Sequence, residues 1–540
     1  MKRYILNKFK LKLCCAAVLF LTFFSCTDDF MEINTNTTEF MELSTKEYGE
    51  LFFQAEHVGV AWQSTDDMSR MSSTLALHNC GYIACGQAAY DCYQLSQGWE
   101  NSGFKDVYVD VLPCLISMMD VAKQAGDVGP YNLALIWKVF QLQRVTDVWG
   151  PTPYSEAGTG KETIPYDSQK DVYYQMFDDL TSAVTALNKE LESDPDMNLF
   201  GSNDNIYAGD VSKWVKLANT LRLRMAIRIS NVDPTKAQQE AEAAIAAGSM
   251  METNDDDALF TVSDLDGEGN GMPRMESFYQ DVMSTNMESV LKGYNDPRME
   301  EYWSPVEENL VNVNFPAIYK QNIGGYHGFA SGSDPTEYTY FRAFSKYGPR
   351  FVDGNQLVTP INVMNAAEAW FLKAEGAWLG WNMGGTAQNF YEKGIEISIK
   401  QWKGTSYSST AINDYINSTA TPVAPDNYPY YDEPMTNIPV KFSSDKTTQY
   451  EQILTQKWIA LFPCAFEAWA EFRRTRLPKL YPKKYSVNAN VLPATGQILT
   501  RCPFAKDEYS ANATEVANAI EMIGGEDLEN VPLWWDVNDN

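Results

Sequence analysis

The stretch Lys457–Leu480, with the sequence KWIALFPCAFEAWAEFRRTRLPKL, decides the fold of this chain. Its apolar residues recur at helical spacing along one wide stripe: Trp458, Leu461, Phe462, Ala465, Trp469 and Phe472. The opposite side is apolar as well, and a polar side begins only at Glu471. We expect one buried helix, ended by Pro478, that other helices cover on several sides. Three arginines then lie near its end, where the helix dipole favours cations: Arg473, Arg474 and Arg476.

Outward from this stretch, the helical period predicts three helix pairs. They are 104–124 with 131–145, 169–191 with 211–230, and a third pair that begins at Asn365. The small and large residues of the third pair alternate nearly as in a tetratricopeptide helix pair. A shorter helix is expected over 235–247. The fold should therefore be mainly all-α, with three arginines of the second pair on its surface: Arg222, Arg224 and Arg228.

Two long segments, at about 249–360 and 404–447, lose the helical period and are rich in Gly, Pro, Asn and aromatic residues. Long irregular segments inside a compact chain are usually functional, so we expect ligand-binding loops there. The first contains Asp264–Gly269, which partly fits a calcium-binding loop, but Met275 stands where that loop requires a bidentate Glu. We interpret it as a turn, and residues 46–540 as one domain.

The N-terminus has the pattern of a lipoprotein signal peptide over residues 1–25, with a basic start and an apolar run. A small residue and then Cys26 follow, as lipoprotein signal peptidase requires. Acyl chains on Cys26 contribute roughly 0.8 kcal/mol per buried methylene and anchor a chain without spanning the bilayer. Residues 26–45 would form a polar tether. The alternative is an ordinary cleaved signal with an incidental cysteine.

The charge balance argues against a nucleic-acid partner. The chain has 42 basic and 71 acidic residues, for a net charge of −29. Residues 1–25 carry five of the bases and no acid, so the mature chain would carry 37 bases against 71 acids, or −34. Such an excess of acid repels phosphate backbones and anionic lipid. The 30 Tyr, 26 Phe and 14 Trp residues suit stacking on neutral ligands instead.

The cysteines do not have the spacing of a metal site. Six would remain in the mature chain besides Cys26: Cys80, Cys85, Cys92, Cys114, Cys464 and Cys502. The gaps around His78 do not match the short paired spacings of zinc ligands. We expect mostly free buried thiols, no metal and no cofactor.

Catalytic signatures are missing from the sequence. It contains no H-E-x-x-H, G-x-S-x-G or P-loop motif, and its three histidines are His57, His78 and His327. Paired carboxylates could serve a glycosidase, but 71 acidic residues make chance pairs inevitable. The chain is therefore not expected to be an enzyme, although a surface glycoside hydrolase or other degradative enzyme remains the alternative.

Several stretches together resemble the SusD/RagB family of nutrient-binding outer-membrane lipoproteins. They are DVWGPTPYSEA (147–157), PYDSQKDVYYQMFDDL (165–180), KWVKLANTLRLRMAIRIS (213–230), EAWFLKAEGAWLGW (368–381), QKWIALFPCAFEAWAEFRRTRLPKL (456–480) and PLWWD (532–536). The resemblance implies an α-superhelical body of tetratricopeptide-like helix pairs with irregular ligand-binding loops. It also implies an anchored position on the outer membrane of a Gram-negative bacterium, facing the exterior. There the protein would capture an oligosaccharide or oligopeptide for a SusC-like TonB-dependent barrel.

The matching stretches belong to the scaffold, so ligand-binding residues are predicted from chemistry alone. A sugar ring presents an apolar face to an aromatic plane and hydroxyls to planar polar side chains. The expected stacking residues are Trp62, Tyr90, Tyr93, Trp99, Trp303, Tyr326 and Phe329, and the expected polar partners are Arg70, Asn101 and His327. A scaffold that uses its helix pairs only for protein contacts is a third possibility.

Overall fold

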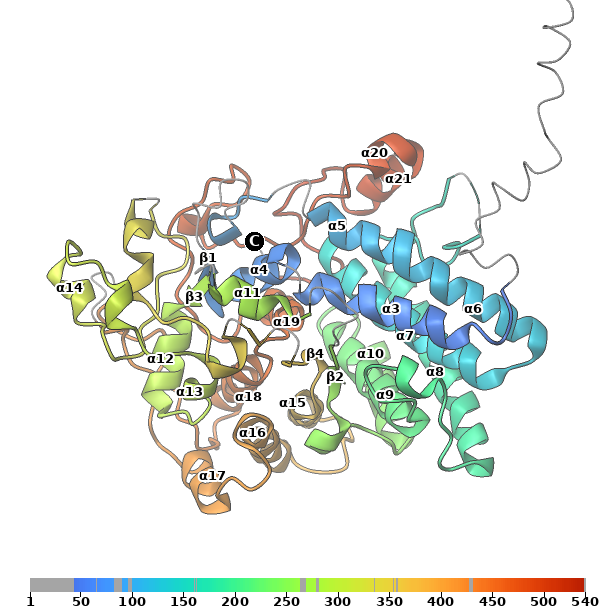
Figure 1. Ribbon diagram of the computed structural model, residues 1–540, viewed down its shortest axis with the longest axis horizontal. Helices are drawn as coiled ribbons and strands as arrows, with labels where there is room; N and C mark the ends of the chain where they lie inside the picture. The colour runs from blue at the N-terminus through green and yellow to red at the C-terminus, as the bar shows by residue number, and fades with distance from the viewer. Residues whose placement is uncertain are drawn as a thin grey trace, which may run out of the picture. The chain divides into compact units, whose positions relative to one another are not determined.

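The computed structural model describes residues 43–64, 66–81, 90–95, 100–159, 161, 163–262, 269–277, 281–334, 336–352, 354–355, 358–426 and 431–538. Residues 48–540 form one compact unit (Figure 1). The predicted signal peptide, Cys26 and most of the predicted tether lie outside the described residues, as does most of Asp264–Gly269. The domain limits and the lipid anchor stay predictions.

The unit is mainly helical, as expected. Its longer helices are α3 (Tyr48–Ser64), α4 (Asp66–Leu75), α6 (Leu112–Ala125), α7 (Val128–Trp149), α8 (Gln169–Ser193), α9 (Val211–Arg228), α10 (Pro234–Ala246), α12 (Thr285–Tyr294), α15 (Ala366–Leu379), α16 (Ala387–Lys403), α17 (Ser409–Ile416), α18 (Lys446–Ala460), α19 (Ala465–Thr475) and α21 (Ala513–Met522). Shorter ones are α5 (Glu100–Lys105), α11 (Gly271–Ser277), α13 (Met299–Tyr302), α14 (Ala317–Lys320) and α20 (Glu508–Ala511). Two small antiparallel sheets pair β1 (Asn79–Gly81) with β3 (Asp281–Met283), and β2 (Ala258–Phe260) with β4 (Ile361–Met364).

The three predicted helix pairs are confirmed. A π-helical turn over Asp106–Val111 leads into α6, which packs against α7; α8 packs against α9, and α15 against α16. Gly126, at φ 79°, ends α6 in the left-handed region, where glycine meets no Cβ clash. Asp210 caps α9 by accepting hydrogen bonds from two backbone N–H groups. Figure 1 shows α3 and α6–α10 on one side of the unit and α15–α18 beside them.

The expectation of one helix over Lys457–Leu480 is wrong. The stretch contains the end of α18, a turn, and then α19, which ends at Thr475. Pro463 lies in the turn; proline has no N–H to donate and its ring clashes with the preceding helical turn, so the helix cannot continue. The prediction of a covered, apolar core element holds, because Trp458 and Trp469 are both almost fully buried.

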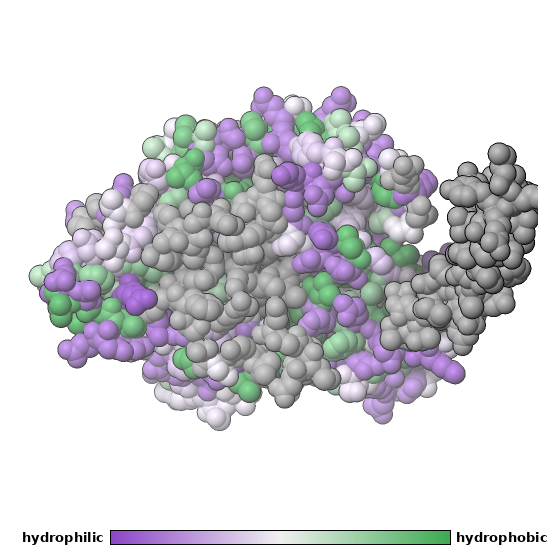
Figure 2. Space-filling view, turned by 45° about the horizontal axis from the view of Figure 1, so that its top comes forward, coloured by the Kyte–Doolittle hydropathy of each residue, from purple (hydrophilic) through white to green (hydrophobic). Residues whose placement is uncertain are grey.

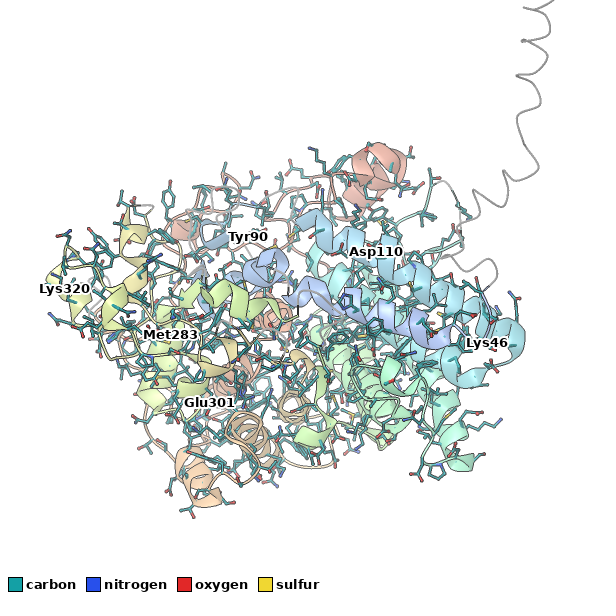
Figure 3. The ribbon with its side chains drawn as sticks, viewed as in Figure 1. Lys46, Tyr90, Asp110, Met283, Glu301 and Lys320 are labelled. Carbon is teal, nitrogen blue, oxygen red and sulfur yellow. The ribbon has the colours of Figure 1, made fainter. Side chains whose placement is uncertain are left out.

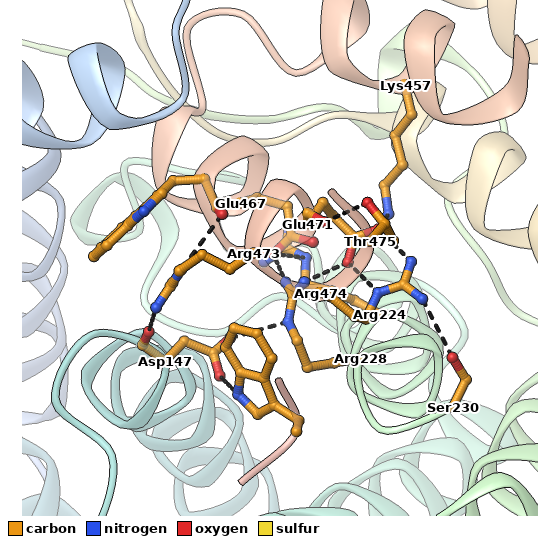
Figure 4. Close-up of polar contacts among 12 residues, drawn as sticks. Asp147, Arg224, Arg228, Ser230, Lys457, Glu467, Glu471, Arg473, Arg474 and Thr475 are labelled. Atoms are coloured by element: carbon orange, nitrogen blue, oxygen red, sulfur yellow. Dashed lines mark hydrogen bonds and ion pairs between the residues drawn. The ribbon is translucent and has the colours of Figure 1, made fainter. Parts of the chain in front are cut away.

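The arginines predicted on the surface are mostly inside. Arg224 and Arg228 of α9 were predicted on the surface but are buried. Arg473 and Arg474 of α19, predicted near the helix end, are buried as well, and Figure 4 shows all four. Carboxylates of neighbouring helices compensate three of them, and Arg473 donates to two backbone carbonyl groups, each at 2.7 Å. Buried charges persist only when they are paired or hydrogen-bonded, and the helix periodicity does not reveal such partners.

The segment 404–447, predicted as irregular, contains α17. The segment 249–360 is largely irregular, as expected, but it contains α12, which was not predicted either. The helix has a recognisable signal: Ser284 caps it, and Met287, Val290, Leu291 and Tyr294 form a buried stripe. The same segment contributes most of a second hydrophobic cluster, which includes Phe329, Tyr338, Phe341 and Phe344. This segment is therefore a packed lobe rather than a set of open loops.

The described cysteines are free thiols, and all but Cys114 are buried. Cys85 lies outside the described residues. Among the described helices, none combines the length and apolarity that crossing a bilayer requires.

Candidate functional site

A cleft of about 320 Å³ lies between α5 and the C-terminal segment near α20 and α21. Its described lining residues are Leu95, Asn101, Asn490, Pro503, Phe504, Lys506, Tyr509, Asp527, Leu528 and Glu529. Figure 2 turns this side of the unit toward the viewer and shows hydrophilic residues mixed with small hydrophobic groups over the described surface. The lining of the cleft itself combines polar side chains, such as Asn101 and Lys506, with apolar ones, such as Leu95.

Hydrogen bonds hold the cleft together across a long sequence separation. The backbone N–H of Lys506 donates to Oδ1 of Asn101 at 2.9 Å. Asn490 donates its side-chain amide to Glu529 at 2.9 Å. These bonds join α5 to the chain at Lys506, and the chain at Asn490 to the chain at Glu529. Local sequence patterns do not predict such contacts.

Asp527 organises the aromatic side of the cleft. Its carboxylate pairs with Arg501, accepts the backbone N–H of Phe504 at 3.0 Å, and accepts the hydroxyl of Tyr509. Burial and the hydrogen bond to Asp527 raise the pKa of Tyr509, so its hydroxyl stays protonated at neutral pH. Tyr509 is nevertheless 45% exposed to solvent. Its position is fixed while its ring remains accessible, which suits an aromatic platform.

Of the predicted ligand-binding residues, Asn101 lies in this cleft. Trp99 lies outside the described residues, and the side chains of Trp62 in α3 and Arg70 in α4 are likewise outside the description. The structure does not bring the remaining predicted residues to Asn101.

Tyr90 and Tyr93 are buried on either side of Asp91. Asp91 pairs with Lys483 at 2.8 Å and accepts the hydroxyl of Tyr338 at 2.6 Å. Tyr90 and Tyr93 therefore pack where the chain around Asp91 meets Tyr338 and Lys483. They expose little surface to a ligand.

Trp303 and Phe329 are fully buried. The Trp303 ring stacks on Tyr347, with ring centroids 5.3 Å apart, and Phe329 lies at the centre of the second hydrophobic cluster. A ring that is covered on both faces cannot stack on a sugar, so neither residue enters the proposal below.

His327 is 5% exposed, and its Nδ1 lies 3.4 Å from Oε1 of the fully buried Glu288. Glu288 also accepts the backbone N–H of Gly328 at 2.7 Å, so this carboxylate holds the loop. Tyr326 is half-buried, and burial raises the pKa of its hydroxyl. Ligand contact by Tyr326 or His327 stays a prediction.

Sequence reasoning missed the C-terminal residues of the cleft, of which Lys506, Tyr509 and Asp527 are the main ones. The signal was two aromatic residues among charged ones, PFAKDEY at 503–509, inside a segment with little helical period. This stretch forms a cleft only together with the distant Asn101, and the two come into contact only in the folded chain.

Comparisons with known proteins agree on one family. A family model described as "SusD and RagB outer membrane lipoprotein" matches residues 31–536. A chitin-binding SusD homologue from Flavobacterium johnsoniae is 32% identical, with 92% of this chain and 99% of that chain covered and a TM-score of 0.77. A SusD-like protein from Bacteroides thetaiotaomicron is 30% identical over 91% of this chain and 99% of that chain, with a TM-score of 0.77. No curated protein matches this chain.

Proposed function

We propose a function from one premise: the chain belongs to the SusD-like family of outer membrane lipoproteins. It binds an oligosaccharide at the cell surface and delivers it to a SusC-like TonB-dependent outer-membrane barrel, without cleaving it. The lipid on Cys26 holds it at the membrane, with the folded unit facing the exterior.

The observation that carries glycan binding is the cleft beside Asn101. Sugars are recognised by an accessible aromatic face together with planar polar groups, and the cleft offers Tyr509, two asparagine amides and Lys506. Its volume of about 320 Å³ suits a short segment of a chain, with further units extending into solvent.

Chitooligosaccharide is the first ligand to test. The Flavobacterium johnsoniae relative, at 32% identity, is described as chitin-binding. The cleft amides can exchange hydrogen bonds with the acetamido groups of such a sugar, because an amide both donates and accepts. An oligopeptide offers similar amides and is the competing ligand class.

Isothermal titration of the purified lipoprotein in detergent tests the proposal. The panel contains chitohexaose, neutral oligosaccharides without acetamido groups, and peptides of comparable length. Saturable binding of an oligosaccharide, with no new reducing ends after long incubation, supports the proposal. Binding of peptides alone, or release of shorter sugars, would contradict it.

Delivery requires a second experiment. Affinity purification of the tagged protein from its own membranes should recover a TonB-dependent barrel together with bound sugar. Recovery of the protein without any barrel would refute delivery but leave glycan binding standing.

A further inference from the structure

A second cavity, of about 260 Å³, lies where three separate segments meet. The segments are the turn before β2, the region that leads into β4, and the C-terminal end of α16. Polar side chains from each line it: Asn254, Asp257, Arg350, Asn362, Lys400 and Gln401. The volume is slightly below the range of about 300–1,000 Å³ that is usual for ligand sites, so it suits a single small molecule.

Arg350 is the central cation of this cavity. Its Nη2 donates to the backbone carbonyl oxygens of Gln401 and Trp402, and its guanidinium carbon lies 4.6 Å from the centroid of the Trp402 ring. These contacts satisfy carbonyl groups that the end of α16 leaves without partners. They also fix the plane of the guanidinium, so that it is held in place before any ligand arrives.

The remaining donors of Arg350 are unused. Among the described residues, no carboxylate lies within ion-pair distance of Arg350, and its Nε and Nη1 have no hydrogen-bond acceptor. Glu301 acts on Arg350 only through its charge, and it pairs with Lys403 at 3.1 Å. A positioned guanidinium fork with two free donor groups matches a carboxylate.

The acidic groups around the cavity oppose an anion only weakly. Glu396 pairs with Lys400 at 2.6 Å. Asp257 accepts the backbone N–H of Ala366 at 2.7 Å, and burial raises the pKa of its carboxyl to about 7, which leaves it partly neutral at neutral pH. The net charge of −29 acts from farther away and is screened beyond about 10 Å at 0.1 M salt.

We propose that this second cavity binds one sugar unit that carries a carboxylate, with the carboxylate on Arg350. The Asn362 side chain and the Oδ1 atom of Asn254 form hydrogen bonds with its hydroxyls, since Nδ2 of Asn254 already donates to Asp257 and to the backbone carbonyl of Ile397. The Asn362 side chain suits this role because it has no hydrogen-bond partner among the described residues, and the Cys464 thiol, at 3.6 Å, donates to the backbone carbonyl of Asn362 instead. An acidic sugar is favoured over a neutral one because a neutral ring would leave the guanidinium donors unused.

This cavity is separate from the cleft beside Asn101, and the proposal does not depend on the proposed function. In Figure 1, β2, β4 and α16 lie below the centre, whereas α5, α20 and α21 lie at the top. Figure 3 shows Glu301, whose charge acts on Arg350, below Asp110, which lies in the π-helical turn that follows α5.

Calorimetric titration of the purified lipoprotein with D-glucuronate tests the proposal, with D-glucose and acetate as matched probes. Glucuronate should bind at millimolar concentration, and glucose and acetate should bind at least about tenfold more weakly. Arg350→Gln should weaken glucuronate binding about tenfold or more, whereas Arg350→Lys should retain part of it.

Because Arg350 also contacts the end of α16, Asn362→Ala provides a variant that leaves this contact in place and should still weaken binding. Tyr509→Ala, in the other cleft, should leave glucuronate binding unchanged. The proposal is overturned if glucuronate does not bind, if glucose binds as tightly, or if neither Arg350→Gln nor Asn362→Ala changes the affinity.

Discussion

The guanidinium of Arg474 lies 2.7 Å from Oε1 of Glu375, and neither side chain is exposed. Arg474 belongs to α19 and Glu375 to α15, so the pair joins two helices through residues that are 99 positions apart in sequence. Glu471 also contacts Arg474, at 2.8 Å, and links it to Lys457 of α18. Figure 4 shows Arg474, Glu471 and Lys457 of this buried ionic group, which joins α15, α18 and α19.

Glu375→Gln should destabilise the protein, because it leaves a buried arginine with less compensation. Removing one partner of a buried pair costs about 3–5 kcal/mol. Urea unfolding monitored by circular dichroism measures the change. As a control, Lys161→Ala breaks the exposed pair with Glu156 and should change the free energy of unfolding by less than about 1 kcal/mol. Equal effects of the two changes would contradict the structural role of the buried pair.

Trp469→Ala should lower the free energy of unfolding by about 3–5 kcal/mol, because it empties a large core site. Trp469 is 1% exposed, and the guanidinium carbon of Arg473 lies 3.6 Å from its ring centroid. Ligand affinity of the folded fraction should be unchanged. Weaker binding at unchanged stability would show instead that α19 belongs to the ligand site.

Tyr509→Ala should weaken oligosaccharide binding about tenfold, which corresponds to about 1.4 kcal/mol, because it removes the accessible aromatic face of the cleft. Titration calorimetry with the best ligand of the panel measures the loss. Tyr485 is the matched control, since it is 39% exposed and does not line the cleft. If Tyr485→Ala has the larger effect, the ligand binds elsewhere.

Asp257→Asn should stabilise the protein increasingly as the pH rises from about 4 to 7. Burial raises the pKa of Asp257 to about 7, whereas an unfolded Asp titrates near 3.9. The folded protein thus holds this proton more tightly, and the stability that the neutral carboxyl provides below pH 4 is lost as the pH rises through 7.

Urea unfolding at a series of pH values measures this difference between the variant and the natural protein. Asp255→Asn is the control, because Asp255 is exposed. A stabilisation by Asp257→Asn that stays constant between pH 4 and pH 8 would refute the assignment.

Cys26→Ser should abolish acylation and release the protein from the membrane fraction, because Cys26 is the predicted lipid attachment site. Metabolic labelling with a tagged fatty acid measures the modification. Cys114→Ser, which changes the one partly exposed described thiol, should leave the label in place. Label that persists without Cys26 would place the lipid elsewhere.

The helix pairs could be predicted because helical periodicity and end signals are local. The stripe of α8 and the N-terminal caps of α9 and α16 lie within a few residues of the helices that they define. The same local evidence contained Pro463, which divides the opening stretch into α18 and α19, and the stripe of α12. The division at Pro463 and the helix α12 were therefore predictable from the sequence, because both signals are local.

The candidate site was predicted only in part, since Asn101 lies in the cleft while Tyr90, Tyr93, Trp303 and Phe329 are buried. An aromatic residue in an irregular segment can either pack or face solvent, and its neighbours in sequence do not decide which. Tyr509 and Asn101 line the same cleft although they are far apart in the sequence. The hydrogen bond between Lys506 and Asn101, which are 405 residues apart, holds the two segments together.

By itself, the sequence determined the helical class of the fold, its helix pairs and the resemblance to the family to which the chain belongs. Only the tertiary structure decided that Arg228 and Arg474 are buried and that Arg350 keeps unused donors. The physical reason is that a helix depends on neighbours three or four residues away, whereas the burial of a charge depends on whether distant segments supply compensating groups.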